Sequence, residues 1–273
     1  MAAPGRAQGS PPTLLAMGDL VLVATAERVR TVTLNRPEAR NALNAALQEQ
    51  AAGALTDAER DGAVDVVILT GADPAFCAGL DLRELGDSGS NLLGRADDAA
   101  RSPFGALRHL TKPVIGAING ACATGGFELA LACDLLVASE RAKFVDTHAR
   151  VGVSPGGGMS VLLPQAIGIR RAKELSFTAS FLDAEEAFRI GLVNHLVAHD
   201  ELLPTARGIA AEIVANDQPA VRNLKSLYDR GSELAPGDAL ALEQEVFRTW
   251  RVDPAEVERR RSGIVARGRE QAG

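Results

Sequence analysis

The chain has 273 residues, of which 46% are hydrophobic and 23% are charged, and its formal net charge is −6 at pH 7. This length exceeds the roughly 100–150 residues of a usual domain, and the apolar content is enough for a large core. The acidic balance gives no reason to expect a nucleic acid or an anionic membrane surface as a partner. Because aromatic residues make up only 4% of the chain, the core must consist of Ala, Val, Leu and Ile.

The cysteines and the N-terminal segment indicate a cytoplasmic protein. Cys77, Cys122 and Cys133 form no CxxC pair, which favours a reducing compartment over a disulfide framework. No apolar run approaches the roughly 20 residues that are needed to span a bilayer. The start is rich in Pro, Gly and Ala and lacks the apolar centre of a signal peptide, so residues 1–14 are expected to be a disordered extension.

Strand-like and helical segments alternate over the first 200 residues. The strand-like segments are rich in Val, Ile and Thr; two of them lie within 20–34, and the others are 65–70, 114–119, 134–138 and 193–197. Helices are predicted over 42–60 and 125–133, and a short amphipathic segment near 80–85. This alternation predicts an α/β fold in which helices cover a sheet, and it hints at repeated strand–strand–helix turns.

From about residue 200 the pattern becomes helical. Four helices separated by Pro or Gly are predicted, over 200–215, 218–231, 238–251 and 254–269. Their apolar stripe, which includes Leu240, Phe247 and Trp250, is typical of packing against the core or against another subunit. Earlier in the chain, the polar segment 86–103 is a loop of the kind that often covers a ligand site.

Two turns rich in small residues, 75–82 and 119–128, each follow an apolar strand and lead towards a helix. Small residues let the backbone approach a ligand, and the amides at a helix start are unpaired. Side by side, the two turns would offer two N–H donors to one carbonyl oxygen, each typically worth roughly 3–4 kcal/mol to a developing oxyanion. Glu128 follows Gly125 by three residues, so its carboxylate could act on a carbon next to that carbonyl.

Five segments resemble the crotonase (enoyl-CoA hydratase/isomerase) family in order and spacing. They are LNRPEARNAL at 34–43, AFCAGLDL at 75–82, KPVIGAINGACATGGFELALACD at 112–134, the segment 144–158, and AFRIGLVNHLV at 187–197. The resemblance implies a spiral of strand–strand–helix turns as the acyl-CoA-binding core, over 15–200. It also implies a C-terminal helical oligomerisation region over 201–273, forming a trimer or a dimer of trimers.

The resemblance also assigns roles to individual residues. The N–H groups of Leu80 and Gly125 correspond to the two oxyanion donors, and Glu128 corresponds to one of two glutamates that hold and activate water in hydratases. The residues implied to contact CoA are Ala39, Arg40, Ala42, Ala78, Leu80 and Asp81. No cofactor is expected, since CoA is part of the substrate, and the sequence has no HExxH or CxxC pair that would indicate a metal site.

The second glutamate of the hydratase pattern is missing. In that pattern it is expected seven residues before the Pro of the next Gly-rich turn, and counting back from Pro155 gives His148. Asp146 lies two residues earlier and is expected to point in a different direction. Three roles are open to His148. It could replace the glutamate as an acid or base, since imidazole titrates near neutrality; it could hydrogen-bond the substrate or Glu128 without transferring protons; or it could be a structural histidine in a site that has lost hydration.

The leading hypothesis is reversible hydration of a trans-2-enoyl-CoA. Glu128 would activate water for attack at the β-carbon, and His148 would deliver the α proton, while the two turns hold the thioester oxygen. Double-bond isomerisation, which needs only one good base, is the alternative within enzymes. An acyl-CoA-binding protein without efficient chemistry is the alternative from another class.

Overall fold

The computed structural model describes residues 13–17, 20–84 and 102–261. Residues 13 and 14, the end of the extension that is expected to be disordered, belong to the first strand. The rest of that extension, and nearly all of the expected loop over 86–103, lie outside the described residues.

The chain forms two compact units, Met1–Arg222 and Asn223–Gly273. The first unit extends beyond residue 200, where the sequence predicts the end of the core. The reason is that helix α9 (Leu202–Val214) packs Leu202, Ala206 and Ala210 against the central sheet. The predicted division of labour between the core and an oligomerisation region stays a prediction.

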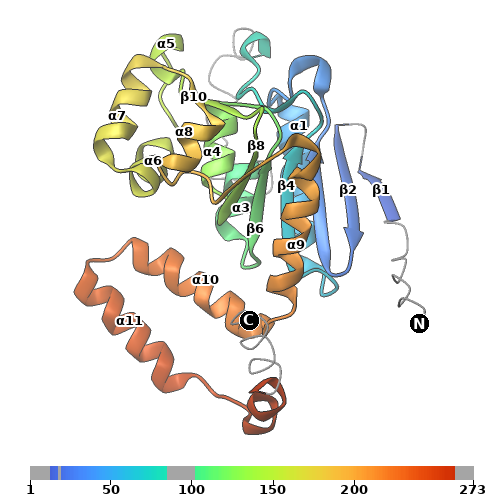
Figure 1. Cartoon of the computed structure of the whole chain (residues 1–273), viewed down its shortest axis with the longest axis vertical. Helices are drawn as coiled ribbons and strands as arrows, with labels where there is room; N and C mark the ends of the chain where they lie inside the picture. The colour runs from blue at the N-terminus through green and yellow to red at the C-terminus, as the bar shows by residue number, and fades with distance from the viewer. Residues whose placement is uncertain (1–12, 18–19, 85–101, 262–273) are drawn as a thin grey trace, which may run out of the picture. The chain divides into compact units, whose positions relative to one another are not determined.

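Seven of the described strands form the central sheet of the first unit (Figure 1). In spatial order they are β1 (Thr13–Met17), β2 (Val21–Ala26), β3 (Val29–Leu34), β4 (Val66–Gly71), β6 (Val114–Ile118), β8 (Leu135–Ser139) and β11 (His195–Val197). The first three are antiparallel, and all pairs from β3 to β11 are parallel. The strands predicted from sequence are confirmed, with ends that shift by one or two residues.

A second sheet holds four short strands in the order β10 (Leu182–Asp183), β9 (Lys143–Val145), β7 (Ala121–Ala123) and β5 (Ala75–Cys77). Each long parallel strand is followed by a short one: β4 by β5, β6 by β7 and β8 by β9. The two small-residue turns thus contain short strands that the sequence does not predict. Residues Ala75 and Cys77 pair with Ala121 and Cys122, so each turn contains a three-residue strand.

Helices cover both faces of the central sheet. In the first unit they are α1 (Ala45–Arg60), α3 (Pro103–His109), α4 (Gly125–Leu131), α5 (His148–Val151), α6 (Met159–Ile167), α7 (Ile169–Thr178), α8 (Ala184–Arg189), α9, and the 3-10 turns η1 (Pro37–Ala39) and η4 (His199–Glu201). Helix α1 begins at Ala45 rather than at 42, because Leu43 pairs with Leu80 and Asn44 caps the helix by accepting from the N–H of Leu47.

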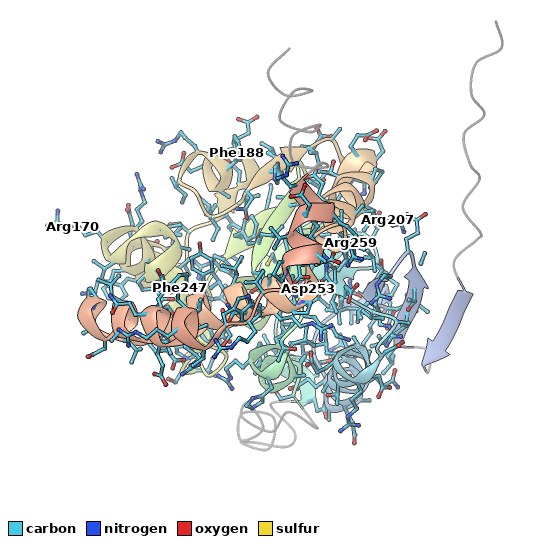
Figure 2. All side chains as sticks on the ribbon, turned by 90° about the horizontal axis from the view of Figure 1, so that it is seen from below. Arg170, Phe188, Arg207, Phe247, Asp253 and Arg259 are labelled. Carbon is cyan, nitrogen blue, oxygen red and sulfur yellow. The ribbon has the colours of Figure 1, made fainter. Side chains whose placement is uncertain are left out.

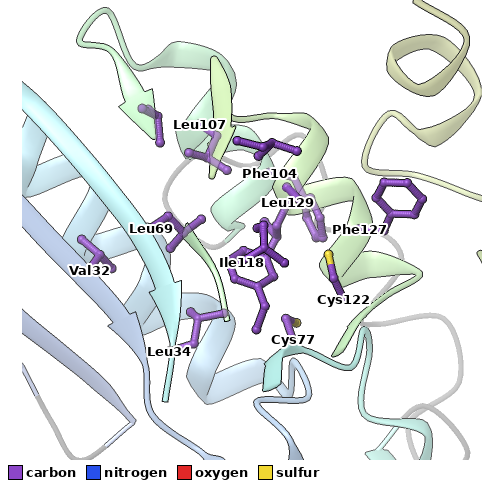
Figure 3. Packing of buried hydrophobic residues seen from close by; sticks show 14 of the residues in the cluster. Val32, Leu34, Leu69, Cys77, Phe104, Leu107, Ile118, Cys122, Phe127 and Leu129 are labelled. Atoms are coloured by element: carbon purple, nitrogen blue, oxygen red, sulfur yellow. The ribbon is translucent and has the colours of Figure 1, made fainter. Parts of the chain in front are cut away.

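Alternation along the strands builds two hydrophobic clusters, because successive side chains point to opposite faces of a sheet. Val66 and Ile68 pack with α9 on one face. Val67 and Leu69 belong to a larger cluster that includes residues of α1, α3 and α4, part of which is drawn in Figure 3. The core is therefore largely aliphatic, as the composition requires.

Two cysteines belong to the larger cluster (Figure 3). Cys77 on β5 and Cys122 on β7 are fully buried. Burial raises the pKa of Cys77 to about 12, and it also raises the pKa of Cys122 well above its ordinary value. Both thiols therefore stay protonated at neutral pH, and they serve as small apolar side chains.

The second unit is helical over its described residues. It contains most of α10 (Gln218–Ser232), α11 (Pro236–Thr249) and a further helical stretch over 254–261. The helices predicted there are confirmed as far as the described residues reach. On α11, Leu240 is 61% exposed and Phe247, labelled in Figure 2, is 81% exposed. These side chains belong to the apolar stripe seen in the sequence, and the surface that covers them stays a prediction.

Candidate active site

One cavity in the first unit collects most of the residues that the sequence singles out. It encloses about 690 Å³, including its opening to solvent. Its walls are formed by Gln48, Ala78, Leu80, Leu82, Phe104, Thr124, Gly125, Glu128, Thr147, His148, Val151, Val153, Ser154, Gly156 and Gly157. Polar groups gather around Glu128, and the remaining wall is mostly apolar. A concave apolar site with a few convergent polar groups is typical of small-molecule binding.

The first turn presents the amide of Leu80 to this cavity. Leu43 donates its N–H to the carbonyl of Gly79 (2.7 Å) and accepts from the N–H of Asp81 (3.1 Å). In such a parallel bridge the central residue, Leu80, directs its own N–H away from Leu43. Within the described parts of the chain, no group accepts from that N–H. The amide is thus available to a ligand in the cavity.

The second turn presents the amide of Gly125 next to that of Leu80. Gly125 is the first residue of α4, so its N–H has no partner inside the helix. A Cβ placed on Gly125 would lie 3.5 Å from the Leu80 nitrogen. Gly79, with φ +92°, makes this approach feasible, because a Cβ there would lie 2.9 Å from the carbonyl oxygen of Ala123. The two donors expected from the sequence therefore lie side by side.

Glu128 lies on α4, one turn after Gly125, and its side chain is only 5% exposed. Its Oε1 accepts from the N–H groups of Gly157 (2.8 Å) and Met159 (3.2 Å). Neither of these donors is predicted from the sequence. Oε2 lies 3.7 Å from Nε2 of His148. One oxygen is thus fixed by the backbone, and the other faces the histidine.

His148 begins α5, and its ring is held by Asp146. Nδ1 of His148 lies 2.6 Å from Oδ1 of Asp146, which also accepts from the backbone N–H of His148 (3.0 Å). As expected, Asp146 does not point into the cavity with His148; instead its carboxylate lies behind the ring. After β9 ends at Val145, the chain makes a turn in which an Asp side chain binds the N–H two residues on.

The protonation of Asp146 follows from its partners. Burial by itself would raise the pKa of this carboxyl. Hydrogen bonds from the ring of His148, from Ser176 and from the N–H of His148 outweigh burial and hold the pKa below its ordinary value. Asp146 is therefore an ionised acceptor at neutral pH.

A hydroxyl pair links the two polar parts of the site. The Oγ1 atoms of Thr124 and Thr147 are 2.5 Å apart, and the N–H of Thr147 donates to Thr124 Oγ1 (3.2 Å). Thr124 precedes α4 and Thr147 precedes α5. The pair thus fixes the turn that carries His148 relative to the helix that carries Glu128.

Comparison with known proteins places this chain in a family. The model of the enoyl-CoA hydratase/isomerase family matches residues 24–266. The chain belongs to this family.

Individual relatives agree with the family match. The chain is 44% identical over 217 residues to a probable peroxisomal enoyl-CoA hydratase of Arabidopsis thaliana, covering 80% of this chain and 81% of the relative. It is 39% identical over 228 residues to the short-chain-enoyl-CoA hydratase of Clostridium acetobutylicum, covering 83% and 87%. The crystal structure of an enoyl-CoA hydratase from Mycobacterium tuberculosis H37Rv matches with a TM-score of 0.72 at 55% identity, covering 85% of this chain and 100% of that one. The mixed α/β fold predicted from sequence is confirmed.

In this member of the enoyl-CoA hydratase/isomerase family, the segments expected to contact CoA lie together. The N–H of Ala78 donates to the carbonyl of Arg40 (3.0 Å). Ala39 ends the 3-10 turn η1, and Arg40 follows it with a left-handed backbone, φ 51°. Ala78 lines the cavity, whereas Ala39, Arg40 and Ala42 do not. Their contact with CoA stays a prediction.

Asp81 forms an ion pair in this region, and its contact with CoA stays a prediction. Its carboxylate binds the guanidinium of Arg36 (2.6 Å), which also donates to the carbonyl of Ala42 (2.9 Å). The hydrogen bond from Arg36 is the main reason why the pKa of Asp81 is below its ordinary value. The pair joins the two segments that are expected to contact CoA, and Asp81 does not line the cavity.

A second hydrogen-bonded chain resembles a catalytic triad without sharing the cavity. Ser139 Oγ lies 3.0 Å from Nδ1 of His199, whose Nε2 lies 3.0 Å from Asp73. Ser139 is fully buried and also accepts from the N–H of Arg141 (3.1 Å). A substrate cannot reach this hydroxyl, so the chain of bonds is structural.

The described ranges hold neither a metal-binding cluster nor a helix that could span a membrane. No three His, Cys, Asp or Glu side chains there form a group that could hold a metal ion. No described helix has both the length and the apolar character that crossing a membrane would require.

Gln48 on α1 carries a buried amide whose Nε2 has no hydrogen-bond partner among the described residues. Leaving a buried donor unsatisfied costs about 1–3 kcal/mol. We therefore expect Gln48→Met, which keeps the chain length, to raise the free energy of unfolding by about 1 kcal/mol in urea titrations. The exposed neighbour Glu49 provides the control, since Glu49→Met should change stability by less than about 0.5 kcal/mol. A lower stability of Gln48→Met would mean that ordered water satisfies the amide.

Proposed function

We propose that the protein reversibly adds water to trans-2-enoyl-CoA thioesters. The observation that carries this proposal is the pair of adjacent amides, Leu80 and Gly125, in one cavity with Glu128. A thioester oxygen between the two amides would accept a hydrogen bond from each. The carbonyl would then be polarised, the β-carbon would become electrophilic, and the enolate formed by attack would be stabilised. The relatives that are named enoyl-CoA hydratases support this substrate class.

Glu128 is the proposed base. Because the amides of Gly157 and Met159 fix Oε1, Oε2 is the oxygen that can receive a proton from water. The water oxygen then bonds to the β-carbon, and the π electrons move to the α-carbon and the thioester oxygen. His148 donates the proton on Nε2 to the α-carbon, which completes the addition. Of the three roles open to His148, proton transfer is supported by the position of Nε2, 3.7 Å from Glu128 Oε2.

The proposal extends to architecture and assembly. Family membership supports a spiral of strand–strand–helix turns, with C-terminal helices that join subunits into a trimer or a dimer of trimers. The exposed Leu240 and Phe247 on α11 support a role of these helices in association. A cytoplasmic location is supported by the three cysteines, which form no disulfide in the described part of the chain; the Arabidopsis relative is named peroxisomal.

The deciding experiment is turnover of crotonyl-CoA in water enriched in ¹⁸O. We expect loss of the conjugated thioester absorbance and one labelled oxygen on the β-carbon of the 3-hydroxyacyl product. Conversion of a 3-enoyl-CoA into a 2-enoyl-CoA without label would instead identify an isomerase. Acyl-CoA binding without either reaction would identify a binding protein, and both results would overturn the proposal.

A further inference from the structure

We propose that Asp146 is a positioning residue that fixes the ring direction and the tautomer of His148. The role of His148 in proton transfer rests on the proposed function, whereas its tautomer is a property of the resting protein. Asp146 lies at the end of β9, outside the cavity wall, and it is not among the residues that the family resemblance assigns to the site.

Asp146 and His148 are joined by two hydrogen bonds that end on one oxygen. Oδ1 of Asp146 lies 2.6 Å from Nδ1 of the ring and 3.0 Å from the backbone nitrogen of the same histidine. Asp146 is 2% exposed and His148 is 7% exposed, so water does not compete for these bonds. Because the carboxylate is tied to the backbone and to the ring of one residue, the imidazole cannot rotate without breaking a buried bond.

The acceptor character of Asp146 determines which ring nitrogen carries hydrogen. An ionised carboxylate can only accept, so Nδ1 must be the protonated nitrogen. A neutral ring has one N–H, which leaves Nε2 as the atom that gains and loses a proton. Nε2 is also the nitrogen on the side of Glu128, 3.7 Å from Oε2. Asp146 thus turns the Nε2 end of the ring towards the proposed base.

This placement gives the ring a route to regain its proton. In the proposed addition, the ring of His148 starts as the cation, with hydrogen on both nitrogens. Water gives one proton to Glu128 Oε2, and His148 gives one from Nε2 to the α-carbon, which leaves the neutral ring with its hydrogen on Nδ1. A proton that then moves from Oε2 to Nε2 returns both groups to their starting states, and the sum is one water added. Among the described residues, the carboxylates within 4.0 Å of the ring nitrogens are those of Asp146 and Glu128. The guanidinium of Arg150 on α5 bonds instead to the carbonyls of Thr178 and Ala179 (both 3.4 Å).

The first test is ¹⁵N NMR of the full-length protein with labelled histidine, recorded over a range of pH. Four histidines give four ring systems, and the spectrum of His148→Gln assigns the one of interest. We expect the neutral His148 ring to show Nδ1–H in the native protein and in Asp146→Asn, whose side-chain oxygen can keep both bonds. Asp146→Ala should show a mixture of tautomers. A native ring that carries its hydrogen on Nε2 would overturn the proposal.

The second test is kinetic. We expect Asp146→Ala to lower kcat for crotonyl-CoA by about 10²-fold, with KM unchanged and with a shifted pH profile. Asp146→Asn should lower kcat by a smaller factor, because asparagine keeps the direction of the ring although it lacks the negative charge. Asp183→Ala is the matched control: Asp183 also accepts an N–H at a helix start, that of Glu186 (2.8 Å) on α8, outside the cavity.

The two variants separate positioning from stability. If Asp146→Ala changes thermal stability as Asp183→Ala does, and leaves both the tautomer and kcat as in the native protein, Asp146 is structural and the proposal fails. Failure of the proposed function would appear differently, as a native protein that does not hydrate crotonyl-CoA whatever the tautomer of His148.

Discussion

Replacing Glu128 with glutamine is expected to lower kcat for crotonyl-CoA hydration by about 10³-fold, within the range typical of a lost general base. The amide cannot receive a proton from water. Its oxygen can still accept from Gly157 and Met159, so the fold should persist. The measurement is the initial rate of loss of thioester absorbance, together with a thermal unfolding curve.

Glu212 on α9 provides the control for this substitution. It is exposed and lies outside the cavity, so Glu212→Gln should leave kcat and stability unchanged. Residual activity of Glu128→Gln close to that of the native protein would contradict the assignment of the base. Such a result would leave His148 as the group that must activate water.

Adding one methyl group to Gly125 is expected to abolish most activity while leaving the protein folded. The new Cβ would lie 3.5 Å from both the Leu80 nitrogen and Gly79 Cα, which are ordinary van der Waals distances. Because it would lie next to the Leu80 amide, we expect the methyl group to crowd the site beside the two amides, where the thioester oxygen is proposed to bind. We expect Gly125→Ala to reduce kcat by 10²–10³-fold, roughly the cost of losing one oxyanion donor.

The adjacent glycine supplies the contrast. A Cβ on Gly126 would lie 2.1 Å from the carbonyl oxygen of Cys77, a buried backbone atom of β5. Gly126→Ala should therefore destabilise the protein strongly, whereas Gly125→Ala should have the same unfolding temperature as the native protein. Full activity of Gly125→Ala would show that the carbonyl does not bind between the amides of Leu80 and Gly125.

Local patterns were enough to predict the parts of the site that come from one segment each. An apolar strand followed by small residues identified the turns of Leu80 and Gly125, and helical spacing placed Glu128 near the second. The short strands β5 and β7 could not be predicted, because three residues carry no periodicity and form a strand only by pairing with each other.

Other parts of the site depend on contacts between distant segments. The amides of Gly157 and Met159 reach Glu128 from about thirty residues away (separations of 29 and 31 positions). The side chain of Asp146 reaches His148 through the turn that follows β9. The strand-like sequence before this turn does not predict its geometry. The same holds for α9, because its pattern of Leu and Ala predicts a helix but not the sheet face on which it packs.

The separation between Glu128 Oε2 and His148 Nε2 has a stereochemical consequence. Two groups on opposite sides of a planar carbon–carbon double bond need about two van der Waals separations between them, roughly 7 Å. The observed 3.7 Å is far shorter. In the proposed reaction, the oxygen and the hydrogen therefore arrive on the same face of the alkene. The addition is syn, and the handedness of the new alcohol follows from the face that the two amides expose.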